Sequence, residues 1–319
     1  MSSQEILNYL SSGEWVSGED IASCMGISRA AVWKQIQRLR TKGYEIESST
    51  RKGYRLAKFH DPLDADMICE GLRTRWLGKD LRCFDEVCST NDVARSIAPE
   101  CQNGTVILAE TQTQGRGRLS RPWASPPGGI WMSLVLKPKI SLDRAYRINM
   151  AVSVAVSRSL CALYGLDVGI KWPNDLLIEG RKVCGILMEI SAEVDRVDWA
   201  VVGLGINANI DVSGFPVEWR STSLRQELGQ EVSRIDLIQK ILLEIEETYQ
   251  SMHSKDLYEE WRRRSATLGK QVRITSASGD LSGEAIDLAE DGALLIRAED
   301  KIKRVLAGDC IHLRAPGEA

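Results

Sequence analysis

Apolar residues near the start of the chain recur at the spacing of an α-helix. Residues 4–10 form the first such segment. A second, residues 17–24, stops at a turn that contains Gly26, and a third occupies residues 28–42. A short helix, a glycine turn and a longer amphipathic helix with a basic face are typical of a helix-turn-helix. The pattern therefore predicts that residues 28–42 are a recognition helix.

Two strand-like runs, residues 44–47 and 53–56, follow the third helix and predict a β-hairpin wing. Basic side chains in the turn of a wing can reach DNA phosphates, while the outer face of a recognition helix reads the bases. The alternative is a small helical domain with a solvated basic face. The expected DNA-contacting set is Ser28, Arg29, Ala30, Lys34, Gln37, Arg38, Arg51 and Lys52.

From residue 61 onward, strand-like apolar runs alternate with helical segments, which predicts a mixed β-sheet covered by helices. The expected strands are residues 81–87, 106–109, 130–136, 168–172, 181–189 and 199–206. The expected helices are residues 64–77, 142–163, 234–252 and 255–267, and one further helix ends at residue 97.

Beyond Gly269 the pattern changes to five short strands separated by turns, which predicts a small SH3-like barrel. The strands expected there are residues 271–275, 283–288, 293–297, 301–306 and 310–313. The whole chain is thus predicted to be an α+β multidomain protein. Its expected domains are residues 1–60, 61–268 and 269–319.

Charge strengthens the case for a separate DNA-facing module. Residues 28–55 carry eight lysines and arginines against two glutamates, a local charge of +6. Because the whole chain carries −3, the remaining residues carry −9. Such an asymmetry is typical of a protein in which one module faces nucleic acid.

Composition narrows the class of protein. No apolar run approaches the ~20 residues that span a bilayer, and the first residues lack the basic and apolar regions of a signal peptide. The eight cysteines include no Cys-x-x-Cys pair, and the chain has only three histidines. We therefore expect reduced thiols, a cytoplasmic location and no structural metal site.

The most distinctive stretch is residues 110–123, which follows the predicted strand 106–109 and contains Arg116, Arg118 and Arg121. Two glycines in the same loop permit close approach of the backbone, so the loop suits an anionic ligand. The alternative is a flexible, solvated basic loop. The stretch matches neither a P-loop nor a dinucleotide fingerprint.

Other polar clusters also fall at predicted strand ends, where ligand sites form in sheet proteins. They are residues 89–91, 171–175, 181–185 and 203–207. Residues 89–91 can bind the polar head of a ligand or simply cap the following helix.

Together and in this order, these clusters closely resemble the biotin–protein ligase family. The run Gly115-Arg116-Gly117-Arg118 and the run Lys171-Trp172-Pro173-Asn174-Asp175 are the most specific parts of the resemblance. With the helix-turn-helix in front, the chain resembles the bifunctional biotin–[acetyl-CoA-carboxylase] ligase and biotin operon repressor type over essentially its whole length. The resemblance implies a class II synthetase-like fold for the central domain.

The resemblance also implies a two-step reaction. Biotin's carboxylate attacks the α-phosphate of ATP to give biotinoyl-5′-AMP, and a lysine of a biotin carboxyl carrier domain then displaces AMP. ATP and Mg²⁺ are the implied cofactors, with biotin as substrate. The implied partners are the carrier domain and operator DNA, and the adenylate-bound protein is expected to form a homodimer that represses transcription.

Site residues are carried over from the matching motifs. The expected catalytic residues are Lys182 and Arg118. The expected biotin-binding residues are Ser89, Thr90, Asn91, Gln112, Arg116, Gly117, Arg118, Lys182 and Gly185. The expected ATP- and adenylate-binding residues are Arg118, Arg121, Trp123, Asn174, Asp175, Lys182 and Asn207, with Asp175 also a candidate ligand of Mg²⁺.

Two rival functions stay open. One is a lipoate or octanoate ligase with a different acyl group in the same pocket, and the other is a biotin-sensing repressor without ligase activity. Residues 208–221 do not align with a family adenine lid, although Trp219 in that loop is a candidate for covering adenine.

Overall fold

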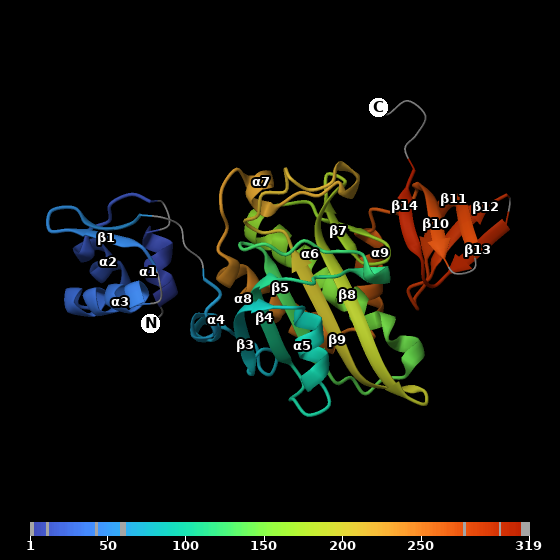
Figure 1. Ribbon diagram of the computed structural model, residues 1–319, viewed down its shortest axis with the longest axis horizontal. Helices are drawn as coiled ribbons and strands as arrows, with labels where there is room; N and C mark the ends of the chain where they lie inside the picture. The colour runs from blue at the N-terminus through green and yellow to red at the C-terminus, as the bar shows by residue number, and fades with distance from the viewer. Residues whose placement is uncertain are drawn as a thin grey trace. The chain divides into compact units, whose positions relative to one another are not determined.

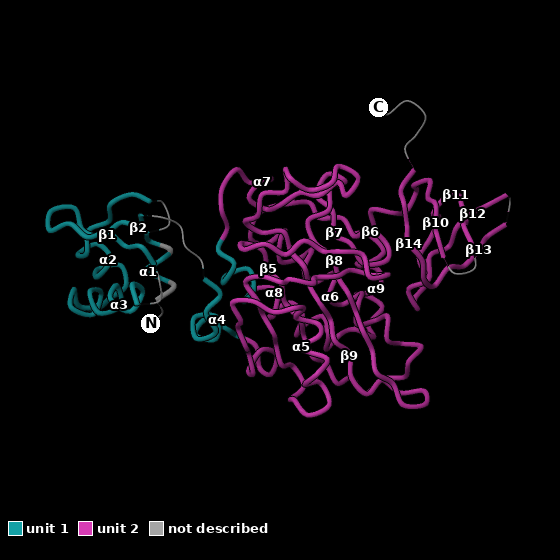
Figure 2. The backbone as a smooth tube through the Cα atoms, in the orientation of Figure 1, with its two compact units in different colours: residues 1–73, 233–239 teal, residues 74–232, 240–319 magenta. Residues whose placement is uncertain are grey.

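The computed structural model describes residues 3–10, 13–41, 44–57, 62–276, 279–299 and 301–313. The chain divides into two compact units (Figure 2). One comprises residues 1–73 with 233–239, and the other comprises residues 74–232 with 240–319. The expected boundary at residues 60 and 61 lies outside the described residues, and the division into three domains stays a prediction.

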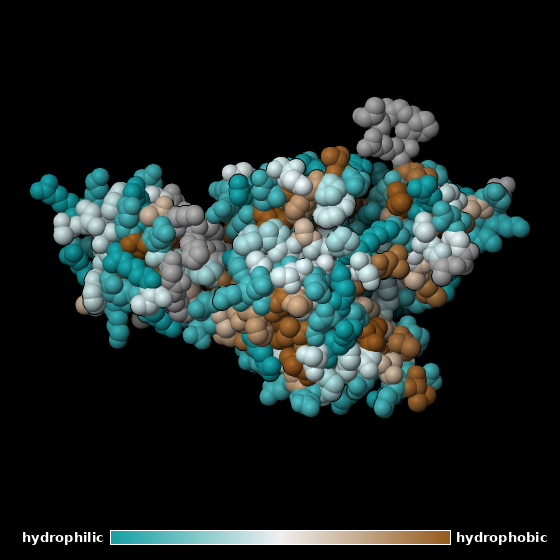
Figure 3. Space-filling view, in the orientation of Figure 1, coloured by the Kyte–Doolittle hydropathy of each residue, from teal (hydrophilic) through white to brown (hydrophobic). Residues whose placement is uncertain are grey.

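The first unit contains the expected winged helix-turn-helix. Its elements are α1 (Ser3–Leu10), α2 (Gly18–Met25), α3 (Arg29–Thr41), β1 (Ile46–Ser49) and β2 (Gly53–Leu56). Ser17 caps α2 by accepting a hydrogen bond from the Glu19 amide, and Gly26 ends α2 in the left-handed conformation at φ 63°. Hydrophilic residues dominate the visible face of this unit (Figure 3).

Helix α4 (Ala65–Gly71) is shorter than the predicted helix 64–77. Its continuation is interrupted because the carboxylate of the buried Glu246 accepts hydrogen bonds from the backbone amides of Arg75, Trp76 and Leu77, at 2.8–3.0 Å. These amides are held by a side chain from another helix, so they are not part of a continuous helical ladder. Helix periodicity in the sequence did not reveal this distant acceptor.

A seven-stranded mixed sheet forms the centre of the second unit (Figure 1). The strand order is β3-β4-β5-β9-β8-β7-β6, and only β3 and β4 run parallel, joined by α5 (Thr90–Ile97). The strands are β3 (Leu81–Val87), β4 (Thr105–Gln112), β5 (Ile130–Leu136), β6 (Gly169–Lys171), β7 (Asp175–Ile178), β8 (Arg181–Glu193) and β9 (Arg196–Ile206). The predicted mixed sheet is confirmed, but β7 was not predicted. Its first residue, Asp175, was assigned to a turn with Pro173 and Asn174, and residues 176–178 were assigned to no element.

Helices cover this sheet. Helix α6 (Tyr146–Tyr164) contacts β6, β7, β8 and α9 (Lys255–Arg263), and α5 contacts β4, β5 and β9. Helix α6 is buried on several faces, as its apolar sequence predicts. Two further helices are α7 (Leu224–Leu228) and α8 (Arg234–Gln250). In the described part of the chain, no helix is long and apolar enough to span a membrane.

The last part of the chain forms a five-stranded antiparallel sheet in the order β13-β12-β11-β10-β14. The five predicted strands are confirmed, as β10 (Gln271–Ser276), β11 (Gly279–Leu288), β12 (Leu294–Ala298), β13 (Lys301–Val305) and β14 (Asp309–His312). Side-chain hydrogen bonds join this sheet to the turn after β6 and to α9. Trp172 Nε1 donates to the Gly292 carbonyl at 2.9 Å, and the Tyr258 hydroxyl donates to the Leu288 carbonyl at 2.6 Å.

The ion-pair cluster between α6 and α9 predicts a pH-dependent contribution to stability. Hydrogen bonds from Arg158, together with those from Arg264, lower the pKa of Glu260 to about 2, from an ordinary value of 4.5. A carboxylate whose pKa falls on folding stabilises the native state above its unfolded pKa, and this stabilisation is lost as pH falls through the folded pKa.

We therefore expect Glu260→Gln to lower the free energy of unfolding at pH 7 by about 2 kcal/mol. The difference from wild type should shrink as pH falls from 4.5 toward 2. Urea denaturation across this pH range measures it, with the exposed Glu247→Gln as control. A difference that stays constant with pH would contradict the assignment.

Candidate functional site

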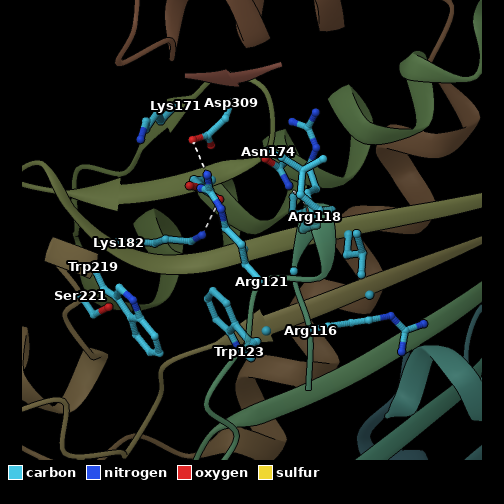
Figure 4. Close-up of a pocket in the computed structure, with 18 of the residues that line it drawn as sticks. Arg116, Arg118, Arg121, Trp123, Lys171, Asn174, Lys182, Trp219, Ser221 and Asp309 are labelled. Atoms are coloured by element: carbon cyan, nitrogen blue, oxygen red, sulfur yellow. Dashed lines mark hydrogen bonds and ion pairs between the residues drawn. The ribbon is translucent and has the colours of Figure 1, made fainter. Parts of the chain in front are cut away.

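A cavity of about 700 Å³ lies in the second unit (Figure 4). Its walls come from four parts of the chain: the start of α5, the arginine loop (residues 112–123), strands β6 to β9, and the segment 218–221. Strand β14 of the C-terminal sheet closes a further side. The cavity thus collects segments more than 200 residues apart in the sequence.

The arginine loop folds back on itself. Gly117 N donates to the Arg121 carbonyl at 2.8 Å, and Trp123 N donates to the Gly115 carbonyl at 2.9 Å. A Cβ atom on Gly115 would lie 2.5 Å from the Trp123 carbonyl oxygen, so this close approach requires glycine. These internal hydrogen bonds favour a shaped binding loop over the solvated loop considered from the sequence.

Two glycines form the floor beneath the indole ring of Trp123. Gly185 on β8 and Gly205 on β9 are direct partners in the sheet register. A Cβ atom would lie 3.0 Å from the indole at Gly185 and 2.5 Å from Trp123 Nε1 at Gly205. The ring can lie against the sheet because both positions lack side chains. Lys182 Nζ lies 4.8 Å from the centroid of the same ring, a cation–π distance.

A neutral polar wall is formed by Ser89, Thr90, Asn91 and Gln112, all of which line the cavity. Ser89 occupies the N-cap position of α5 but makes no side-chain capping bond, so capping does not account for its hydroxyl. The Thr90 amide donates to Gln112 Oε1 at 2.8 Å, and Gln112 Nε2 donates to the Ser125 hydroxyl at 2.8 Å. These contacts fix the orientation of the Gln112 amide.

Basic residues outnumber acidic ones in the walls. The cavity is lined by the basic residues Arg116, Arg118, Arg121, Lys171, Lys182 and Arg220 and by the acidic residues Asp175, Glu218 and Asp309. Six positive and three negative charges leave an excess of +3, whereas the whole chain carries −3. Such a cavity attracts anions.

Three of these six cations, Lys182, Arg121 and Arg116, form ion pairs among the described residues, and the other three do not. Lys182 Nζ lies 2.7 Å from Asp175 Oδ1, and the Arg121 guanidinium lies 2.8 Å from Asp309 Oδ2 (Figure 4). Within the described residues, Arg118 and Lys171 form no ion pair. Their charges remain available to an anionic ligand.

Arg116 differs from the other arginines of the loop, because its side chain points away from Lys182 and Arg121 in Figure 4. Its guanidinium makes two bonds to the carboxylate of Asp92, at 2.6 and 2.8 Å, and a longer one to Glu189 at 3.3 Å. The bond from Arg116 lowers the pKa of Asp92, and the bond to Asp92 raises the pKa of Arg116. The positive charge of Arg116 is therefore paired with carboxylates on α5 and β8.

Two predicted asparagines are used largely within the protein. Asn207 is buried and does not line the cavity; its Nδ2 donates to the Thr222 carbonyl at 2.9 Å. Asn174 lines the cavity, but its Nδ2 donates to the Ile186 carbonyl. Asn207 thereby holds the segment that follows β9. The same segment is bound to β8 beside the cavity, because Lys182 N donates to the Arg220 carbonyl at 2.7 Å.

The remaining predicted residues of this site, including Gly117, lie in the cavity wall, and so does Trp219. Asp309 and His312, which lie on β14 and also line the cavity, were not predicted from the sequence. Burial lowers the pKa of His312 to about 4, so this side chain is neutral at pH 7. No local sequence signal could identify them, since their position depends on how the C-terminal sheet packs.

The predicted DNA-contacting face is largely exposed on α3, where Val32, Ile36 and Leu39 form the buried side. Trp33, which was not in the predicted set, is 57% exposed on the same helix. In the wing, the Arg55 guanidinium lies 5.0 Å from the centroid of the Trp15 ring and pairs with Glu47 at 2.6 Å. Arg55 is therefore held at the base of the wing.

Comparisons with known proteins match three segments of this chain. A helix-turn-helix domain matches residues 3–55, the biotin/lipoate A/B protein ligase family matches residues 84–207, and the biotin protein ligase C-terminal domain matches residues 267–313.

Similar curated proteins cover nearly the whole chain. The bifunctional ligase/repressor BirA of Bacillus spizizenii is 39% identical over 303 residues, which are 93% of each chain. BirA of Escherichia coli is 27% identical over 98% of this chain and 97% of its own. The structure of a biotin protein ligase from Aquifex aeolicus in complex with biotin and ATP is 30% identical, with a TM-score of 0.64, over 74% of this chain and 100% of that one.

The glycine floor gives a prediction that does not depend on the ligand. Gly205→Ala places a methyl group against Trp123 Nε1, so we expect a loss of about 1–3 kcal/mol in the free energy of unfolding from overpacking. The matched control is Gly214→Ala, because nothing lies within 4 Å of a Cβ atom at that position. Equal urea stabilities for the two variants would show that the ring does not need the glycine.

Proposed function

This chain belongs to the biotin protein ligase family, and we propose that it uses ATP to join biotin to a lysine of a biotin carboxyl carrier domain. Its N-terminal helix-turn-helix extends the function to repression of transcription at operator DNA. The similarity to bifunctional ligase/repressor proteins over 93% of the chain supports both activities.

One observation carries the ligase proposal: a single cavity combines a neutral polar wall with an excess of cations. Biotin has a neutral cyclic urea at one end and a carboxylate at the other. The neutral wall suits the urea, which needs both donors and acceptors, and the cations suit the carboxylate beside the phosphates of ATP. A purely cationic cavity would not explain Ser89, Thr90 and Gln112.

In the first step, a carboxylate oxygen of biotin attacks the α-phosphorus of ATP. The bond to the bridging oxygen breaks, pyrophosphate leaves, and biotinoyl-5′-AMP forms. Lys182 and Arg118 act as catalytic cations, because negative charge accumulates where the carboxylate meets the α-phosphate. Lys182 pairs with Asp175 at 2.7 Å. The bound substrates must therefore either replace Asp175 as the partner of Lys182 or bind Lys182 alongside Asp175.

The nucleotide brings Mg²⁺ into the same region. Mg²⁺ at nucleotide sites is held by one or two carboxylates together with phosphate oxygens. Asp175 is a carboxylate in the cavity wall beside the cations and fits this role, with Asp309 paired to Arg121 nearby. The metal would supply charge neutralisation of the phosphates when bound.

In the second step, the neutral ε-amine of the carrier lysine attacks the carbonyl carbon of the mixed anhydride. The bond to the AMP oxygen breaks, AMP leaves, and the amine loses a proton as the amide forms. Trp123 and Trp219 line the cavity and would exclude water from the anhydride, whose hydrolysis would waste the activated biotin.

The repressor half rests on the winged helix-turn-helix and its basic charge. In this proposal the adenylate-bound protein forms a homodimer, which brings two recognition helices to a two-fold symmetric operator. Ligand ordering of the arginine loop and of residues 208–221 lowers the entropy lost on dimerisation. The protein acts in the cytoplasm, where its eight free thiols stay reduced.

Substitution of Lys182 tests the first chemical step. We expect Lys182→Ala to reduce biotin-dependent exchange of pyrophosphate into ATP by at least about a hundredfold, because a fixed cation at the reacting oxygens is lost. Lys255→Ala, an exposed lysine at the start of α9, is the control and should exchange at the wild-type rate. Wild-type exchange by Lys182→Ala would remove Lys182 from the mechanism.

The repressor half is tested by DNA binding and sedimentation. The purified protein should bind its own upstream DNA more tightly with biotin and ATP than without, and Arg38→Ala should weaken binding by a few-fold and reduce its salt dependence. Sedimentation should show a stronger dimer with both substrates present. An identical monomer–dimer equilibrium with and without them would contradict the coupling.

A further inference from the structure

A chain of hydrogen-bonded side chains, of which Asn91, Ser133 and Thr90 are buried and Glu189 is partly exposed, lies behind the neutral wall of the cavity. It runs from Glu189 on β8 through Asn91 and Ser133 to Thr90. Ser133 is fully buried on β5 and does not line the cavity, whereas Thr90 does. Neither Ser133 nor Glu189 was among the residues expected to bind a ligand.

Glu189 fixes which way the Asn91 amide faces. Asn91 Nδ2 donates to Glu189 Oε2 at 2.7 Å, and a carboxylate can only accept. The amide oxygen must then face the other way, where it lies 2.7 Å from the Ser133 hydroxyl. Asn91 is only 4% exposed, so water cannot easily replace these partners.

The Ser133 hydroxyl therefore donates its single hydrogen to Asn91 Oδ1. Ser133 Oγ also lies 2.8 Å from Thr90 Oγ1, and two oxygens at this distance need a hydrogen between them. Because the Ser133 hydrogen is directed at Asn91, the hydrogen between Ser133 and Thr90 must come from the Thr90 hydroxyl. The hydroxyl of Thr90 has a second contact, to Gln112 Oε1, but at 3.1 Å it is longer than the 2.8 Å contact to Ser133 and beyond the usual O–H···O range, and Gln112 Oε1 is already satisfied by the Thr90 amide at 2.8 Å. The shorter contact to Ser133 therefore takes the Thr90 hydrogen.

We infer that Glu189, Asn91 and Ser133 are positioning residues that make Thr90 a hydrogen-bond acceptor toward the ligand. The Thr90 hydrogen points into the protein, so only lone pairs of its oxygen remain for the cavity. The site then selects a ligand with an N–H group at this position and rejects one with an oxygen there. This inference rests on the proposed function, in which the ligand group is a ring N–H of the cyclic urea.

The glycine at position 203 supports the same arrangement. A Cβ atom on Gly203 would lie 2.3 Å from Asn91 Oδ1, so a larger residue on β9 would displace the amide. The backbone of β8 adds a weaker contact, since Asn91 Nδ2 lies 3.4 Å from the Leu187 carbonyl. The sheet thus leaves room for the Asn91 amide, and β8 provides acceptors for its nitrogen.

The test compares two ligands: biotin and its carbamate analogue, in which one ring N–H is replaced by oxygen. Calorimetry on the full chain gives the ratio of the two dissociation constants. Wild type should prefer biotin strongly. Ser133→Ala releases the Thr90 hydrogen, so the preference should fall by about tenfold or more. A merely structural loss would weaken both ligands together and leave the ratio unchanged.

Glu189 both accepts a hydrogen bond from Asn91 and pairs with Arg116, and variants separate these two roles. Glu189→Gln keeps an oxygen that can accept from Asn91, so the preference for biotin should be retained, whereas Glu189→Leu should lose it. Asp92→Asn perturbs the pairing of Arg116 without touching Asn91 and should leave the preference unchanged. Ser153→Ala, another fully buried serine, controls for the loss of a buried hydroxyl.

An unchanged preference in both Ser133→Ala and Glu189→Leu, with thermal unfolding showing folded proteins, would overturn the inference. Failure of the proposed function has a different signature, because wild type itself would then bind neither ligand. A loss of preference in these two variants together with its retention in Glu189→Gln would establish the positioning role.

Discussion

The cavity depends on the absence of side chains at three positions of one β-hairpin. Gly185 and Gly205, opposite each other on β8 and β9, leave space for the indole of Trp123, and Gly203 leaves space for the amide of Asn91. A β-sheet normally presents a side chain at every second residue. Because these three positions have no side chains, the arginine loop and the start of α5 can approach the backbone of the sheet closely. The residues of the neutral wall and the cations consequently face one shared cavity.

Charge is distributed so that two regions attract anions while the chain as a whole is acidic. The winged helix carries one basic cluster, and the cavity wall carries an excess of three positive charges. Within the cavity, Asp92 and Glu189 direct Arg116 to a structural pairing, whereas Arg118 and Lys171 form no ion pair in the described residues. Neighbouring arginines in one loop therefore have different tasks, which depend on the carboxylates that the fold places beside them.

The sequence predicted elements and motifs well where the information is local. Periodicity identified the winged helix, the mixed sheet and the five C-terminal strands, because each is encoded by neighbouring residues. Tertiary contacts decided the rest. The distant carboxylate of Glu246 shortened α4, the partners of Arg116 turned it away from Lys182, and the packing of β14 brought Asp309 and His312 into the wall. Ser133 is one polar residue in an apolar strand, and only its neighbours in space give it a role.

The ligase activity is tested by the mass of a biotin carboxyl carrier domain after incubation with this protein, biotin, ATP and Mg²⁺. We expect the carrier domain to gain one biotinoyl group on one lysine, and this gain should depend on both biotin and ATP. An unmodified carrier domain would contradict the claim. In that case, labelling by lipoate or octanoate would assign the cavity to another acyl group, and tight biotin binding without labelling would leave a sensor that does not ligate.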